Sequence, residues 1–157
     1  MIPVLVPLAL MSAGVAAGVM LGNALGPAEL AMRLPYGRYV ELIRFMWPRY
    51  DPMLPILNAL ALVLDIAIAV MAAGAADGAA AAASFGLAAA LLAVLMVISV
   101  TRNVPINKYV TALDPAREPA DWARRDPRAA WRKWNQVRVA LALGSLAAAL
   151  VGAAFLL

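Results

Sequence analysis

Cysteine and histidine are both absent from this chain of 157 residues. Without cysteine the chain has no disulfide, no thiolate nucleophile and no thiolate metal ligand. Without histidine it also lacks the usual protein ligands of haem, copper and zinc, and any Ser-His or Cys-His dyad. Carboxylates remain as metal ligands, but no two of them share a helical face at ligand spacing. We therefore expect no metal site and no bound cofactor.

Charge is also scarce, and apolar residues dominate the chain. Charged residues make up 14% and hydrophobic residues 65% of it, and the mean hydropathy is +0.84. Four long apolar runs cover residues of about 1–25, 53–73, 79–101 and 134–157. Each run can cross the hydrocarbon layer as a helix, which needs roughly 20 apolar residues, and none alternates as a barrel strand does. The sequence therefore predicts an all-α fold, a single transmembrane domain built as a four-helix bundle.

The basic residues are confined to two stretches of the chain. Of the 13 basic residues, four arginines precede the second run, and the other nine lie between Arg102 and Arg138. The connection at residues 74–78 has none. Because basic loops are retained in the cytoplasm, we expect both basic stretches inside and both termini outside. The net charge of +4 then reflects orientation and contact with anionic membrane lipids, and no nucleic-acid-binding motif is present.

Alanine-rich spans and an excess of arginine over lysine are typical of GC-rich bacteria, so we expect a bacterial cytoplasmic membrane.

Residues 34–47, between the first two runs, mix apolar and charged residues at helical spacing. Val40 and Ile43 recur on one side, with Arg38 and Arg44 between them. This pattern predicts an amphipathic helix at the membrane interface, with its aromatic residues at the headgroup level. Such a helix serves either as a solvated anchor or as a substrate gate, and we favour the anchor. A proline-rich stretch is expected to end it before the second span.

Glycines mark one face of the first run. The run carries a glycine at every fourth position, namely Gly14, Gly18, Gly22 and Gly26. Small residues at this spacing let membrane helices approach closely. We favour packing against a neighbouring helix of the same chain, and the alternative is a homodimer through Gly14, Gly18 and Gly22. Gly144 and Gly152 repeat the device in the last run.

Asp65 is the only acidic side chain inside an apolar run. Asn58 precedes it by two helical turns, so both side chains lie close to one stripe of the helix. A carboxylate is expensive in the membrane, where it marks a functional site or holds helices together by hydrogen bonds. Asp65 is therefore either a packing group or a catalytic proton acceptor, and Asn58 is a candidate ligand contact.

A second polar set lies toward the expected cytoplasmic interface. Asn103 and Asn107 are four residues apart on one helical face, and Pro105 between them removes a backbone donor. The last run begins with polar and aromatic residues at i, i+3, i+4 and i+7, which are Trp131, Trp134, Asn135 and Arg138. If the two sets meet, they form a pocket in which Arg138 and the amides stabilise an enolate or phenolate while the indoles stack on rings. The alternative is that the tryptophans anchor the helix and the polar groups satisfy its end.

These residues also carry a family resemblance. The stretch RNVPINKYVTALDP, followed by WRKWNQVR, resembles the signature of the anthrone-oxygenase-like family of small membrane proteins. The resemblance implies a four-span bundle and, for the characterised members, oxidation of an anthrone to an anthraquinone by molecular oxygen without a dedicated cofactor. Many members have no assigned function. Some relatives place a histidine near the tryptophans, and this chain has none.

Three functions are consistent with the sequence. The first is binding or oxidation of a lipophilic aromatic compound, whose oxyanion is held by Arg138 and the amides while Asp65 or a water acts as base. The second is a non-catalytic scaffold or accessory subunit that packs through the glycines. The third is a small proton-coupled exporter that depends on Asp65. We favour the first, on the resemblance.

Overall fold

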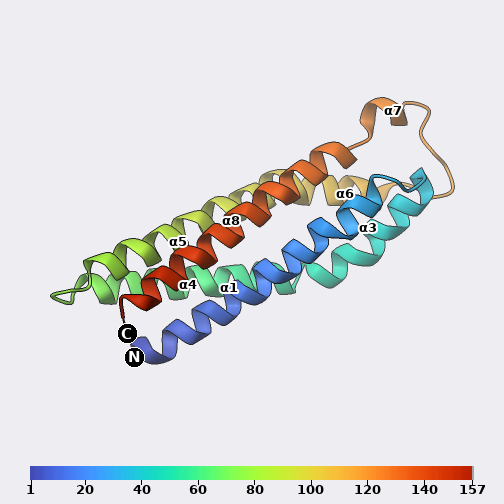
Figure 1. Cartoon of the computed structure of the whole chain (residues 1–157). Helices are drawn as coiled ribbons and strands as arrows, with labels where there is room; N and C mark the ends of the chain where they lie inside the picture. Colours follow the sequence, from blue (N-terminus) through green and yellow to red (C-terminus); the bar gives the residue numbers. More distant parts are fainter. Residues whose placement is uncertain (157) are drawn as a thin grey trace.

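A computed structural model describes residues 1–156, and this part of the chain forms helices and connecting turns without a strand (Figure 1). Four helical segments are long and apolar enough to cross a membrane, namely Ile2–Ala31, Met53–Ala73, Ala79–Ala112 and Trp122–Ala154. The predicted all-α fold is confirmed, and the chain is a multi-pass membrane protein. In chain order the helices are α1 (Ile2–Leu25), α2 (Pro27–Ala31), α3 (Tyr36–Tyr50), α4 (Met53–Ala73), α5 (Ala79–Ile98), the π-helical turn η1 (Ser99–Asn103), α6 (Val104–Ala112), α7 (Trp122–Arg125) and α8 (Arg128–Ala154).

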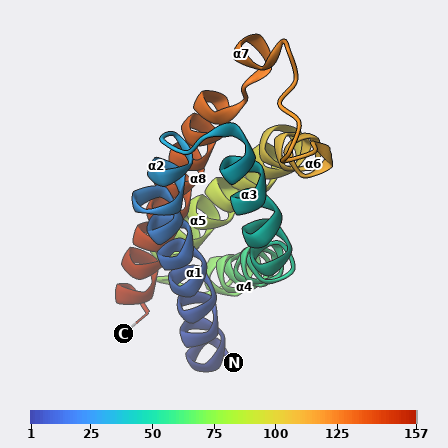
Figure 2. The ribbon, with the colours of Figure 1, turned by 90° about the vertical axis from the view of Figure 1, so that its right-hand side faces the viewer.

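Helices α1, α4, α5 and α8 pack side by side as an elongated bundle (Figure 1). Both termini and the connection at residues 74–78 lie at one end of it. The short helices α2, α3, α6 and α7 gather at the other end, which Figure 2 shows facing the viewer, with α3 between α1 and α6. The two stretches that hold the basic residues therefore share one end of the molecule, which we call the basic end.

Small side chains fill the middle of the bundle. Alanines from three helices meet there, including Ala16, Ala61 and Ala142, each at most 3% exposed. Small residues let the helix axes come close, so that dispersion contacts hold the bundle together in an apolar surrounding. Ser145 of α8 also donates its hydroxyl to the carbonyl oxygen of Ala88 of α5 at 3.0 Å, which adds a polar contact between two of the spans.

The glycines of α1 do not pack inside the bundle, so the favoured intrachain interpretation is wrong. A Cβ built on Gly14, Gly18 or Gly22 meets no atom within 4 Å. The buried stripe of α1 is formed by alanines instead, and the glycines lie beside it on the outer surface. Gly152 of α8 allows the close helix packing that was predicted, because a Cβ there would lie 2.8 Å from the ring of Phe85 on α5.

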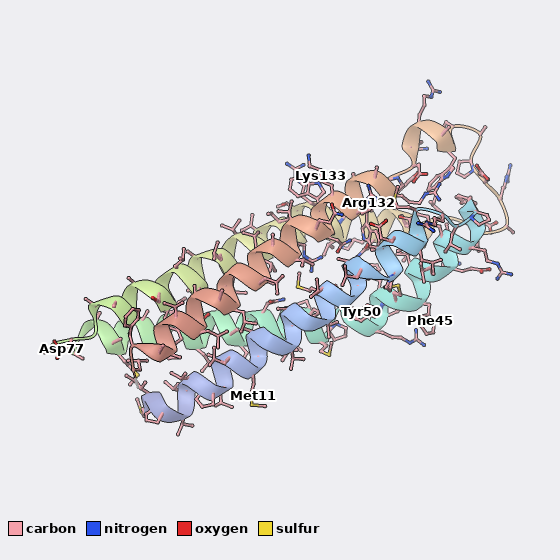
Figure 3. All side chains as sticks on the ribbon, in the orientation of Figure 1. Met11, Phe45, Tyr50, Asp77, Arg132 and Lys133 are labelled. Carbon is pink, nitrogen blue, oxygen red and sulfur yellow. The ribbon has the colours of Figure 1, made fainter. Side chains whose placement is uncertain are left out.

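Helix α3 is the predicted amphipathic helix, but it ends later than expected. It continues through Pro48 to Tyr50, and the N–H of Asp51 still donates to the carbonyl oxygen of Trp47 at 2.9 Å. Its apolar face is buried against the rest of the basic end, while Arg38 and Phe45 are exposed on the other side. In Figure 3 Phe45 points away from the bundle.

Two arginines fix α3 and its neighbours at the basic end. Arg44 donates to the carbonyl oxygens of Thr111 at 3.0 Å and Leu113 at 2.8 Å, which joins α3 to the end of α6. Arg128 pairs with Asp126 and donates to the carbonyl oxygen of Leu34 at 2.7 Å, close to the start of α3. The C-terminal carbonyls of a helix lack intrahelical partners, so the contact of Arg44 stabilises the end of α6, while Arg128 holds the connection before α3.

The phenol of Tyr39 is buried beneath Arg128, and this burial changes its pKa. The guanidinium lies 5.4 Å from the Tyr39 ring centroid, and burial raises the pKa of that phenol above its ordinary value. Desolvation disfavours the phenolate, so Tyr39 stays neutral and packs as an aromatic core residue of the basic end.

Candidate functional site

A cavity of about 140 Å³ lies at the basic end, between α3 and the bundle. Its volume is far above the roughly 10–15 Å³ that one water molecule needs. Part of its wall is apolar and includes Met20, Ile43, Met46, Leu54, Leu95 and Met96. Its remaining wall is aromatic or polar, and the side chains come from α1, α3, α4, η1, α6 and α8. The combination of flat apolar walls and convergent polar groups is typical of a small-molecule site.

Six of the residues singled out in the sequence line this one cavity. They are Asn58, Asn103, Asn107, Trp131, Asn135 and Arg138. The two polar sets that were expected to meet do so through a direct contact, in which Trp131 donates its indole Nε1–H to Asn107 Oδ1 at 3.0 Å. Asn135 donates to the carbonyl oxygen of Trp131 at 3.0 Å, one helical turn back. The contact with Asn107 holds the indole of Trp131 in a fixed orientation against the cavity.

Asp65 and Trp134 do not line the cavity. Asp65 is 1% exposed and lies seven residues beyond Asn58 on α4, about 10 Å further along a helix that rises ~1.5 Å per residue. Trp134 faces the surface, where the guanidinium of Arg102 lies 5.3 Å from its ring. The geometry thus gives no support to Asp65 as the base or to Trp134 as a wall of the site.

Unpaired polar atoms are concentrated around the cavity. In the described part of the chain, five lining residues carry buried polar atoms without a hydrogen-bond partner. The donors are Trp47 Nε1, Asn103 Nδ2 and Arg138 Nε, and the acceptors are the Oδ1 atoms of Asn23, Asn58 and Asn103. A buried polar atom without a partner costs about 1–3 kcal/mol, so such atoms are few in native proteins. Their concentration here indicates a site prepared for a polar group of a ligand.

The turn η1 directs Asn103 into the site. Pro105 has no N–H, and the chain adapts with a wider turn in which the N–H of Val104 donates to the carbonyl oxygen of Ser99, five residues back. The hydroxyls of Ser99 and Thr101 bond to carbonyls four residues back at 2.8 and 2.7 Å, a contact that often bends helices. Asn103 is 2% exposed as a result. Such π-helical turns occur frequently at functional sites.

Five polar or aromatic lining residues escaped the sequence analysis. They are Asn23, Trp47, Tyr50, Asp51 and Ser99. The aromatic pair looked like a headgroup anchor, and the proline-rich surroundings of Asp51 looked like a connector. Figure 3 shows Tyr50 where α3 meets α4, far from Asp77 at the opposite end. The i, i+3, i+4 spacing of Trp47, Tyr50 and Asp51 was the available signal, because it places all three on one helical face.

One guanidinium and one carboxylate line the cavity. Arg138 reaches it from α8, and Asp51 from the end of α3. Asp51 is the acid whose charge acts on Arg138 through space, but no ion pair joins them in the part of the chain that the structure describes. Because Arg138 Nε has no partner, the site offers a fixed positive charge to a ligand. In a region of low dielectric such a charge stabilises an oxyanion strongly.

The fold and the cavity define a class, that of multi-pass helical membrane proteins with a polar site at one end of the bundle. The sequence model of the anthrone oxygenase family matches residues 47–150, which is more than half of the chain, and the protein therefore belongs to this family. The match confirms the resemblance and covers the cavity residues of α4, η1, α6 and α8. No curated protein and no solved structure matches the chain.

Proposed function

We propose that this protein oxidises, with molecular oxygen, a lipophilic aromatic ketone of the anthrone type that reaches the cavity from the membrane. The observation that carries the proposal is the guanidinium of Arg138 in a largely apolar cavity, surrounded by unpaired amide groups. Indole and methionine walls suit flat rings, and the donors suit a negatively charged oxygen. Membership of the anthrone oxygenase family supports the same substrate class.

The reaction needs no co-reactant beyond oxygen. Loss of a proton from C10 of an anthrone leaves the electron pair on carbon, delocalised onto the ketone oxygen. Arg138 and the amide donor of Asn103 stabilise this oxyanion. The anion gives one electron to O₂, and the resulting carbon radical and superoxide join in a new C–O bond. After protonation the hydroperoxide loses water, so that one anthrone and one O₂ yield one anthraquinone and one water.

Trp131 would position the rings of the substrate. Its indole donates Nε1–H to Asn107, and the side chain is 5% exposed and packs in the hydrophobic cluster of the basic end. A rigid aromatic wall allows offset stacking with little loss of side-chain entropy. The chemistry then depends on positioning and charge stabilisation rather than on a nucleophile of the protein.

We also propose that the basic end faces the cytoplasm of a bacterial cell and that the bundle crosses the cytoplasmic membrane. The proposal is supported by the common position of both basic stretches at one end and of both termini at the other (Figure 1). Basic loops are retained on the cytoplasmic side. Membrane lipids are then the surrounding partners, and the outward glycines Gly14, Gly18 and Gly22 leave the predicted homodimer as a further proposal.

Anthrone oxidation by the purified protein in lipid nanodiscs tests the function. Oxygen uptake and anthraquinone absorbance should rise well above the protein-free rate. Arg138→Met keeps the length of the side chain but removes its charge, and it should lower that gain by about 10²–10³-fold, as expected for loss of an oxyanion donor. Arg132→Met is the matched control on the same helix, because Arg132 pairs with Glu29 outside the cavity. Equal rates with and without the protein would overturn the proposal.

A further inference from the structure

The cavity contains one acid that the sequence analysis did not consider. Asp51 is the only acidic residue among those that line it, whereas Asp65 lies further along α4 and outside it. Removal of the C10 proton requires a base within hydrogen-bond reach of that carbon. We propose that Asp51 is the catalytic base that accepts the C10 proton, an inference that rests on the proposed function.

The position of Asp51 is set by the backbone on both sides. Its N–H donates to the carbonyl oxygen of Trp47 at 2.9 Å and closes the last turn of α3, and Pro52 precedes α4 directly. In the described part of the chain the carboxylate makes no ion pair and accepts no hydrogen bond from the protein. Both carboxylate oxygens are therefore available to a substrate, on a backbone that two helices hold in place.

The charges of Asp51 and Arg138 suit the transfer of a proton from the substrate to Asp51. Asp51 is exposed at the edge of the cavity and acts electrostatically on Arg138, which reaches in from α8. When the carboxylate takes the proton, the negative charge moves to the ketone oxygen of the substrate beside Arg138. The total charge of the site does not change, and the negative charge that moves into the cavity lies beside the guanidinium of Arg138, which stabilises it.

The step balances without any further reagent. The C10–H bond breaks, the proton forms an O–H bond with Asp51, and the electron pair stays on the substrate as the delocalised anion. Because Asp51 is exposed, it then returns the proton to water or to the peroxide formed with O₂. The oxidant remains the molecular oxygen of the proposed function.

Hydrogen exchange separates this step from the oxidation. In D₂O without oxygen, the C10 hydrogens of anthrone exchange only as the C–H bond breaks, and mass spectrometry follows the uptake of deuterium. The wild-type protein in nanodiscs should accelerate exchange over protein-free nanodiscs. Asp51→Asn should reduce that gain by about 10²-fold or more, as expected for loss of a general base. Asp51→Glu should restore a part of it.

Two further acids supply matched controls. Asp65→Asn changes a buried acid outside the cavity, and Asp77→Asn changes an exposed acid at the opposite end of the bundle (Figure 3). Both variants should exchange at the wild-type rate. Circular dichroism and the thermal midpoint of Asp51→Asn should match the wild type, because the side chain has no protein partner to lose.

The outcomes distinguish this inference from the proposed function. Wild-type exchange in Asp51→Asn overturns the role of Asp51, while oxygen uptake by the wild type and its loss in Arg138→Met still decide the function. Exchange that depends on Asp51, but without any oxidation in air, keeps Asp51 as the base and overturns the oxygenase. Exchange at the protein-free rate in the wild type overturns Asp51 as the base.

Discussion

Trp131 and Asn107 join two segments of the cavity wall, through a 3.0 Å hydrogen bond between residues 24 positions apart in the sequence. The bond links the start of α8 to α6. It uses the donor of an indole that is otherwise surrounded by apolar and aromatic neighbours. The contact therefore contributes both to the stability of the basic end and to the shape of the site.

Trp131→Phe should weaken the protein and the site together. The change keeps an aromatic ring but leaves Asn107 Oδ1 without its donor, which should lower the free energy of unfolding by about 1 kcal/mol. Trp134→Phe removes an indole that makes no hydrogen bond in the described part of the chain, so its thermal midpoint should stay close to wild type. The thermal midpoint in detergent and the KM for anthrone measure the two effects. Equal shifts in both variants would contradict the assigned role of the contact.

Pro105→Ala should separate activity from stability. The substitution restores the missing N–H, so the wide turn η1 can return to an α-helix and rotate Asn103 by about 100° away from the cavity. We expect an unchanged or higher thermal midpoint but a clearly lower rate of anthrone oxidation. Pro7→Ala makes the same chemical change inside α1, far from the site, and should leave the rate unchanged. Full activity of Pro105→Ala would show that η1 does not orient Asn103 for the reaction.

The main parts of the fold could be predicted because membrane solvation leaves few alternatives. Long apolar runs must satisfy their own backbone, so the four membrane-spanning helical segments followed directly from the sequence. The meeting of Asn107 with Trp131 could be predicted from helical spacing and from the common side of two basic stretches. These features depend on local patterns and on the bilayer, not on detailed packing.

Other parts of the site depend on packing between distant segments. The role of α3 as a cavity wall could not be predicted, because Trp47 and Tyr50 have the same spacing whether they face headgroups or a ligand. The outward position of Gly18 depended on which of two adjacent small-residue stripes the other helices cover. Pro105 indicated an irregular backbone. That this irregularity is the π-helical turn η1 depends on how the neighbouring helices hold Asn103.

Asp65→Leu should leave anthrone oxidation unchanged and stabilise the protein. Asp65 is 1% exposed, and neither carboxylate oxygen has a partner in the described part of the chain. A buried polar group without a hydrogen bond costs about 1–3 kcal/mol, so an apolar side chain of similar size should raise the thermal midpoint. A loss of oxidation would give Asp65 a part in the reaction. Substrate-dependent proton release that disappears in Asp65→Asn would instead favour the exporter.

The orientation of the bundle can be tested with single cysteines, because the natural chain has none. Asp77→Cys lies in the exposed connection of residues 74–78, and Ala116→Cys lies in the exposed loop after α6, at the basic end. If the basic end is cytoplasmic, a membrane-impermeant maleimide added to intact bacterial cells should label Asp77→Cys alone. Ala116→Cys should react only after the membrane is permeabilised, because retention of the basic loops keeps it inside. Labelling of Ala116→Cys in intact cells, with Asp77→Cys protected, would place the cavity on the outer side and reverse the proposed topology.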